Sequence, residues 1–245
     1  MSKEVWMGLS VAAALAVAGC STASDPGPVS SSVVLADPIR PAADVARDAD
    51  RKPAELMAFA GIRRGQKIAE LAPGGGYFTR LLTGAVGPSG KVYAIAGRPS
   101  PALTELATQR ANLAVVVAPG GTIPVTDAVD VVWTTLNYHD FKNAKLPTGD
   151  AALALNAEAF RVLKPGGTYL VVDHQAAPGA GASVTSTLHR IESAQVRSEV
   201  EAAGFRLEAE SDLLRHPQDD HTAKVQETGI RGKTDQFILK FRKPR

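Results

Sequence analysis

The sequence has little of several features that would assign it to a class directly. Only one of its 245 residues is a cysteine, so no internal disulfide can form. Aromatic residues make up 5% of the sequence and are scattered along it, and the formal net charge is only +2. The sequence therefore provides neither a stacking platform nor a strongly basic surface, and we expect no nucleic-acid partner.

Long apolar runs are also scarce, and the clearest one lies at the N-terminus. Residues Val5–Gly19 are almost wholly apolar but too few for a bilayer-spanning helix, which needs about 20 residues. The run suits a signal-peptide core, and it ends in Val17-Ala18-Gly19-Cys20, which resembles the lipobox of bacterial lipoproteins. We therefore predict a lipoprotein signal peptide over residues 1–19 and lipidation of Cys20. An ordinary secretory signal with an incidental cysteine is the alternative.

The residues after the cysteine suggest a location and a tether. Ser21, not Asp, follows Cys20, which in Gram-negative lipoproteins resembles sorting to the outer membrane, on its periplasmic side. Residues 20–38 are rich in Ser, Pro, Ala and Asp without periodicity, so we predict a flexible tether there. Residues 39–245 would then form one domain with a sizeable core.

Apolar periodicity and turn residues predict an α/β domain. Strands are predicted at 67–71, 91–96, 114–117, 129–134, 168–173, 206–211 and 236–241, and helices at 53–60, 77–85, 101–111, 152–163 and 191–203. The strand-then-helix rhythm favours a mostly parallel sheet with helices on both faces, and the last two strands suit an antiparallel hairpin. The charged residues Arg47, Asp50, Arg51 and Lys52 precede the helix predicted at 53–60; we interpret this segment as a solvated helix face, with a lid over a ligand as the alternative.

The most informative stretch is Lys67–Leu82. It reads as a strand that carries an acid near its end, a break at Pro73 and Gly74–Gly76, and a helix. Glycines let the backbone approach a ligand closely, and a helix start offers unpaired N–H groups. A nucleotide-like ligand fits these features, although neither G-x-G-x-x-G nor G-x-x-x-x-G-K-[ST] is present.

The spacing of the acid and the glycines resembles the first motif of class I S-adenosylmethionine-dependent methyltransferases. Glu70, Gly74 and Gly76 match that motif, and Ala72 stands where its first glycine is usual. Further segments resemble the same family, most specifically the Leu163-Lys164-Pro165-Gly166-Gly167 turn. Together with the lipobox, the chain is similar to bacterial predicted-methyltransferase lipoproteins. The resemblance implies a Rossmann-like seven-stranded sheet, mostly parallel with a C-terminal antiparallel strand, and S-adenosyl-L-methionine as cofactor.

The resemblance also implies positions for the cofactor. They are Glu70 near its methionine part, Ala72, Gly74 and Gly76 along its path, Thr134 and Leu136 near the methyl donor, and Ala96 at the end of the second strand. Ala96 is a departure, because the family usually has an acid there for the ribose hydroxyls.

Polar residues follow the fourth and fifth strands, where methyl acceptors lie in this family. His139, Asp140 and His174 are the candidate catalytic residues, with a histidine as general base. A metal held by Asp140, Asp173, His174 and His221 is an alternative, but no tight ligand spacing supports it and no metal ligand is assigned. A third interpretation is that these polar residues lie at loop ends and only form hydrogen bonds with the backbone. We interpret His189 and Arg190 as ordinary surface, and Arg231–Thr234 as a solvated turn.

Two functions follow as hypotheses. The first is methyl transfer from S-adenosylmethionine to an unknown, small-molecule acceptor. The second is a catalytically inactive envelope lipoprotein that keeps the methyltransferase fold and binds another ligand or a protein partner. Ala96 and an exported location, which offers no evident cofactor supply, favour the second, and the motifs favour the first.

Overall fold

The computed structural model describes Met1 and residues 31–118, 120–126 and 128–245. The predicted signal peptide, Cys20 and the first part of the tether lie outside these residues. Within the described ranges, no helix is both long enough and apolar enough to cross a membrane.

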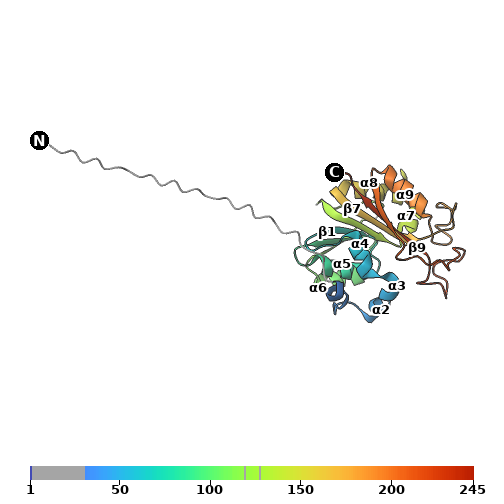
Figure 1. Ribbon diagram of the computed structural model, residues 1–245, viewed down its shortest axis with the longest axis horizontal. Helices are drawn as coiled ribbons and strands as arrows, with labels where there is room; N and C mark the ends of the chain where they lie inside the picture. The colour runs from blue at the N-terminus through green and yellow to red at the C-terminus, as the bar shows by residue number, and fades with distance from the viewer. Residues whose placement is uncertain (2–30, 119, 127) are drawn as a thin grey trace.

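A seven-stranded sheet forms the centre of the domain (Figure 1). Its order is β3-β2-β1-β4-β7-β9-β8, and the strands span Lys67–Leu71 (β1), Lys91–Ala96 (β2), Leu113–Val117 (β3), Val129–Thr135 (β4), Leu163–His174 (β7), Arg206–Ser211 (β8) and Gln236–Arg242 (β9). All neighbouring pairs are parallel except those of β9, which runs antiparallel to both β7 and β8. The predicted Rossmann-like methyltransferase sheet is confirmed.

Helices cover both faces of the sheet. On one face lie α4 (Pro53–Ala60), α5 (Tyr77–Val86) and α6 (Pro101–Gln109); on the other lie α7 (Tyr138–Asn143), α8 (Ala151–Val162) and α9 (Ser193–Ala202) (Figure 1). Side chains alternate between the two cores along each strand, so Val131 and Trp133 pack toward α5 while Val132 packs toward α8. This alternation decides which residues at the strand ends can face a ligand.

The N-terminal segment is folded onto the domain earlier than expected. Helix α1 (Ser31–Leu35) packs against α4 and α5, and its Val34 is buried in the core. Asp37 pairs with Arg110 beyond α6. Residues 31–38 therefore belong to the domain and not to the tether predicted there. Their short apolar stretch lacked the length for a periodic helix signal.

Two short helices follow and lead to the site. Helices α2 (Ala42–Val45) and α3 (Asp48–Arg51) come before α4, whose first residue is the predicted helix-starting Pro53. A small hairpin of β5 (Lys145–Leu146) and β6 (Gly149–Asp150), unpredicted like α7, lies between α7 and α8.

Candidate functional site

A cavity of about 270 Å³ opens at the carboxyl ends of β1 and β4. The strand order reverses between these two strands, and open α/β sheets bind ligands at such a point. Its walls come from the ends of β1 and β4, the glycine turn, α2, α3 and the start of α5: Asp44, Arg47, Arg51, Glu70, Ala72, Pro73, Gly74, Gly75, Tyr77, Phe78, Thr135, Leu136 and Asn137. The sheet thus brings residues distant in the sequence to one site.

The glycine turn leaves room for a ligand. A Cβ added to Gly74 or Gly75 would meet no atom within 4 Å, so these residues face open space in the cavity wall. Ala72 has a φ of 49° and Leu136 a φ of 59°, in the left-handed region that disfavours residues with a Cβ. The backbone at Ala72 therefore has the conformation that favours glycine, which is usual in the motif. Such strain is concentrated at functional sites in proteins.

Glu70 provides a buried carboxylate in this cavity. Its Oε2 accepts a 2.6 Å hydrogen bond from the Thr79 hydroxyl on α5. Burial raises the pKa of Glu70 to about 7, although the Thr79 hydrogen bond and the positive charge of Arg80 oppose the rise. A cationic group of a ligand would favour the ionised form.

Three of the positions implied by the resemblance do not line the cavity. Thr134 faces the α8 side and is fully buried, because side chains alternate along β4; Thr135 takes the cavity side instead. Gly76 is the N-cap of α5 and packs close to Leu103. Ala96, at the end of β2, is buried and supplies no carboxylate.

A second, basic cavity of about 470 Å³ adjoins the first. The two share Arg47, Arg51 and Leu136, and the second is also lined by His174 and Arg231. In the described part of the chain, no carboxylate forms an ion pair with Arg47, Arg51 or Arg231, although Asp50 is among the lining residues. The charged segment that we interpreted as a solvated face therefore contributes two cavity-lining arginines.

Arg51 lies where the two cavities meet. Its guanidinium is 4.6 Å from the centre of the Tyr77 ring, a cation–π contact. Burial, together with the charge of Arg47, lowers the pKa of Arg51 to about 10, so it stays positive at neutral pH. Arg51 is half-buried and forms no ion pair within the described residues, so it is suited to binding an anion.

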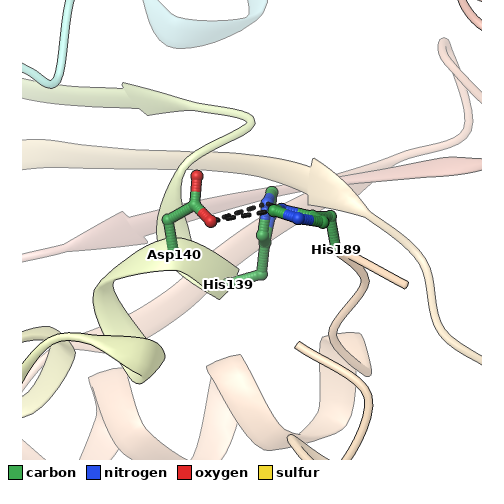
Figure 2. Close-up of side chains that lie close together, drawn as sticks. All are labelled: His139, Asp140 and His189. Carbon is green, nitrogen blue, oxygen red and sulfur yellow. Dashed lines mark hydrogen bonds and ion pairs between the residues drawn. The ribbon is translucent and has the colours of Figure 1, made fainter. Parts of the chain in front are cut away.

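His139, Asp140 and His189 converge beyond β4 and β7 (Figure 2). His139 and Asp140 belong to α7, and His189 belongs to the segment before α9. His189 is half-buried beside His139, so our interpretation of it as ordinary surface is wrong, and Arg190 is fully buried. A single histidine in a polar loop carries no sequence signal that would predict this contact.

Asp173 contacts the histidine cluster through His139. It is fully buried; its Oδ1 lies 2.7 Å from His139 Nδ1, and its Oδ2 accepts the His139 backbone N–H at 2.8 Å. Burial opposes protonation of His139, but the charge of Asp173 and its hydrogen bond outweigh burial and raise the pKa of His139.

His174 lies next to this cluster and faces the basic cavity. Its ring centre is 5.9 Å from that of His139, and its Nδ1 lies 2.8 Å from the Thr234 hydroxyl. Burial lowers the pKa of His174 to about 4, so the imidazole is neutral at pH 7. His221 instead contacts Asp235, at 3.2 Å, outside the cluster formed by the other histidines.

Known structures share this architecture. An S-adenosylmethionine-dependent methyltransferase from Aquifex aeolicus is 19% identical with a TM-score of 0.58, covering 80% of this chain and 97% of its own. A 1,6-didemethyltoxoflavin-N1-methyltransferase from Burkholderia thailandensis with bound S-adenosylhomocysteine is 16% identical with a TM-score of 0.56, covering 82% and 80%. The cyclase SpnF, at 18% identity and a TM-score of 0.57, covers 80% and 81%. No curated protein matches the chain in sequence.

The class of the domain follows from its fold and from a family match. The sheet and the cavity at its switch point define the class I methyltransferase fold. Residues 69–171 match the family described as "Methyltransferase domain". Residues 69–171 are thus similar to a methyltransferase domain, and the fold around them is the one that solved S-adenosylmethionine-dependent methyltransferases share. The open glycine turn and the buried acid fit that cofactor, whereas Ala96 leaves its ribose hydroxyls without the usual carboxylate.

Proposed function

We propose that the chain transfers a methyl group from S-adenosylmethionine to a small, negatively charged acceptor. The observation that carries the proposal is the shared wall of the two cavities. The cavity at the glycine turn and the basic cavity meet at Arg47, Arg51 and Leu136. A donor in the first and an acceptor in the second would be neighbours, which is the main requirement of a displacement reaction.

Glu70, Gly74, Gly75 and Leu136 are the residues that would hold the cofactor. The cofactor supplies a methyl group already activated on a sulfonium sulfur. The chain therefore contributes mainly alignment and exclusion of water. If the acceptor must lose a proton, His174 is the imidazole that lines the acceptor cavity, and its pKa of about 4 makes it a weak base there.

The charge of the second cavity indicates the acceptor class. Arg51, Arg47 and Arg231 line it without ion-pair partners in the described ranges. Arginine forks bind carboxylate and phosphate oxygens through paired hydrogen bonds. A small carboxylate or phosphate ester is therefore the proposed acceptor.

Cofactor binding is tested by calorimetric titration of the purified chain with S-adenosylmethionine and S-adenosylhomocysteine. We expect micromolar binding that is lost in Glu70→Ala. Glu105→Ala removes an exposed acid on α6 and serves as the matched control. Absence of binding at millimolar cofactor would contradict the proposal.

Acceptor class is tested with a labelled methyl donor and a panel of small carboxylates, phosphate esters and neutral analogues. We expect methyl transfer to charged members only, and a loss of at least about tenfold in Arg51→Met. Arg206→Met is the control, because Arg206 is exposed at the start of β8. Equal transfer to the neutral analogues would contradict an anionic acceptor.

A non-catalytic role is the second candidate, and Ala96 favours it. The cyclase of similar fold is itself a catalyst and shows only that one fold can serve different activities. In this case the chain would bind another ligand or a protein partner and not the cofactor. The calorimetric titration distinguishes the two candidates.

The proposed cellular setting is the outer membrane, periplasmic side, with the chain anchored through a lipid on Cys20 after removal of residues 1–19. The apolar run and the Val17–Cys20 lipobox support it. Incorporation of labelled palmitate that disappears in Cys20→Ser tests the anchor. Equal labelling of both proteins, or of neither, would contradict it.

A further inference from the structure

The donor atoms of His139, Asp140 and His189 form a nearly equilateral triangle (Figure 2). His189 Nδ1 lies 3.3 Å from His139 Nε2 and 3.3 Å from Asp140 Oδ1, and His139 Nε2 lies 3.4 Å from Asp140 Oδ1. Zinc bonds of about 2.0–2.1 Å that meet at tetrahedral angles hold donor atoms about 3.3–3.4 Å apart. The triangle therefore has the dimensions of three tetrahedral zinc ligands.

We propose that His139, Asp140 and His189 bind one divalent transition-metal ion of the zinc type. Two imidazoles and one carboxylate are a donor set that such ions accept, and three protein ligands leave a fourth position for a water or a substrate oxygen. The proposal concerns a site that methyl transfer itself does not require.

Hydrogen bonding explains the triangle less well. N–H···O bonds in proteins are 2.7–3.2 Å long, and the two edges that join a histidine nitrogen to Asp140 Oδ1 are longer, at 3.3 and 3.4 Å; the third edge, at 3.3 Å, joins two nitrogens. The other nitrogen of His139 shows what a hydrogen bond looks like here, because it lies 2.7 Å from Asp173. Three ligand atoms around one shared ion would have nearly equal separations that are longer than a hydrogen bond, as these three atoms do.

Asp173 prepares His139 as a ligand. A proton on His139 Nδ1 donates to Asp173, so the lone pair of the neutral ring is on Nε2, which faces Asp140 and His189. Histidine ligands of metals almost always donate their other N–H to such an outer acceptor. Asp173 also accepts the backbone N–H groups of His139 and His174, which fixes its own position.

His189 is held in place by its chain neighbours. Its φ is 56°, a strained value for a residue with a Cβ. The next residue, Arg190, is fully buried and pairs with Asp219 at 2.7 Å, and the Ile191 N–H donates to the His174 carbonyl oxygen. These contacts maintain a backbone conformation that would otherwise relax, and they direct His189 to the triangle.

The site is accessible and lies beside the acceptor cavity. The Asp140 side chain is 50% exposed, so an ion can enter from solvent. His174, which lines the basic cavity, packs next to His139. An ion here could bind an acceptor oxygen and lower its pKa, which is one of the ordinary catalytic uses of a metal.

The test uses the purified full chain after dialysis against EDTA, without cofactor. Titration with zinc chloride should give one ion per chain, and Co²⁺ in its place should give the absorption of a tetrahedral site. We expect His189→Asn and Asp140→Asn each to weaken zinc binding by at least about tenfold. Asparagine suits position 189 because it tolerates the left-handed backbone.

The matched controls keep the result interpretable. His221→Asn replaces another histidine with a left-handed backbone, φ 64°, outside the triangle, and Asp212→Asn replaces a fully solvated acid. Both should bind zinc like the unchanged chain. Absence of stoichiometric binding, or binding that survives both triangle variants, would overturn the proposal. Titration of the EDTA-treated chain with S-adenosylmethionine measures cofactor binding separately from zinc binding, so the two proposals can fail independently.

Discussion

Glu70, at the end of β1, accepts a 2.6 Å hydrogen bond from Thr79 on α5, and both side chains are buried. This pairing joins the strand to the helix across the glycine turn. The Thr79 hydrogen bond lowers the pKa of Glu70 by less than burial raises it, so the pKa rises from 4.5 to about 7. The relationship makes the stability of the ligand-free protein depend on pH.

The first prediction concerns that dependence. Between pH 4.5 and about 7 the folded Glu70 binds more protons than the unfolded one, so the contribution of Glu70 to the free energy of unfolding should fall as pH rises through this window. The slope from this group is at most ~1.4 kcal/mol per pH unit. Because His174, whose pKa is lowered, contributes an opposite slope to both proteins, urea unfolding should show the fall in the difference between the unchanged chain and Glu70→Gln. Parallel curves for the two proteins would contradict it.

Regular elements were predictable because their local signals agreed with their burial. Strands β1, β2 and β8 and helix α4 have the predicted bounds, since a glycine or proline lies close to at least one end of each. The sheet order followed from the family resemblance. Short elements such as α1 and α7 were not predicted, because their few residues carry no measurable periodicity.

The site was predictable only in part, for two physical reasons. Successive side chains of a strand point to opposite faces of the sheet, so an error of one residue selects the wrong face. For this reason Thr135 lines the cavity, and the predicted Thr134 is buried on the other face. Arg51 and His189 reach the site through tertiary packing of short helices and a long loop. The charged segment before α4, residues 47–52, was the available signal for Arg51, and His189 had none.

The second prediction concerns a close backbone approach at Gly90. A Cβ there would lie 2.4 Å from Val86 Cβ and 2.7 Å from the Gln66 carbonyl oxygen. Gly90→Ala should therefore destabilise the protein by about 1–3 kcal/mol, and lower Tm by about 2–4 °C for each kcal/mol. Thermal unfolding checks it. The control is Gly75→Ala, where the added methyl meets open space; a similar loss in both variants would contradict the steric reason.

The third prediction uses Gly75 to test the cavity as the cofactor site. Gly75 faces open space in the wall and does not have a left-handed backbone, so a larger side chain should leave folding intact. Gly75→Leu would fill part of the cavity and should weaken cofactor binding by at least about tenfold, with Gly75→Ala in between. Calorimetry measures binding and thermal unfolding measures stability. Unchanged affinity in a folded Gly75→Leu protein would place the cofactor elsewhere.

The fourth prediction addresses the residue that departs from the family pattern. Ala96 ends β2, the neighbour of β1, and is 7% exposed, so burying an aspartate there would lower stability. If the cofactor ribose lies at this strand end, the new carboxylate can accept bonds from both hydroxyls. Hydrogen bonds to charged groups contribute about 1.5–3 kcal/mol, so Ala96→Asp should raise affinity by at least about tenfold.

Ala96→Asn separates charge from size in this experiment. Asparagine has nearly the same shape as aspartate but a neutral acceptor, so it should raise affinity less. The measurement is calorimetric titration with S-adenosylhomocysteine for the unchanged chain and both variants, with circular dichroism to verify folding. Higher affinity in the order Ala, Asn, Asp would show that the natural alanine weakens a working cofactor site. Folded variants that bind no more tightly than the unchanged chain would mean that the ribose is not held at β2, and would favour a ligand other than the cofactor in this cavity.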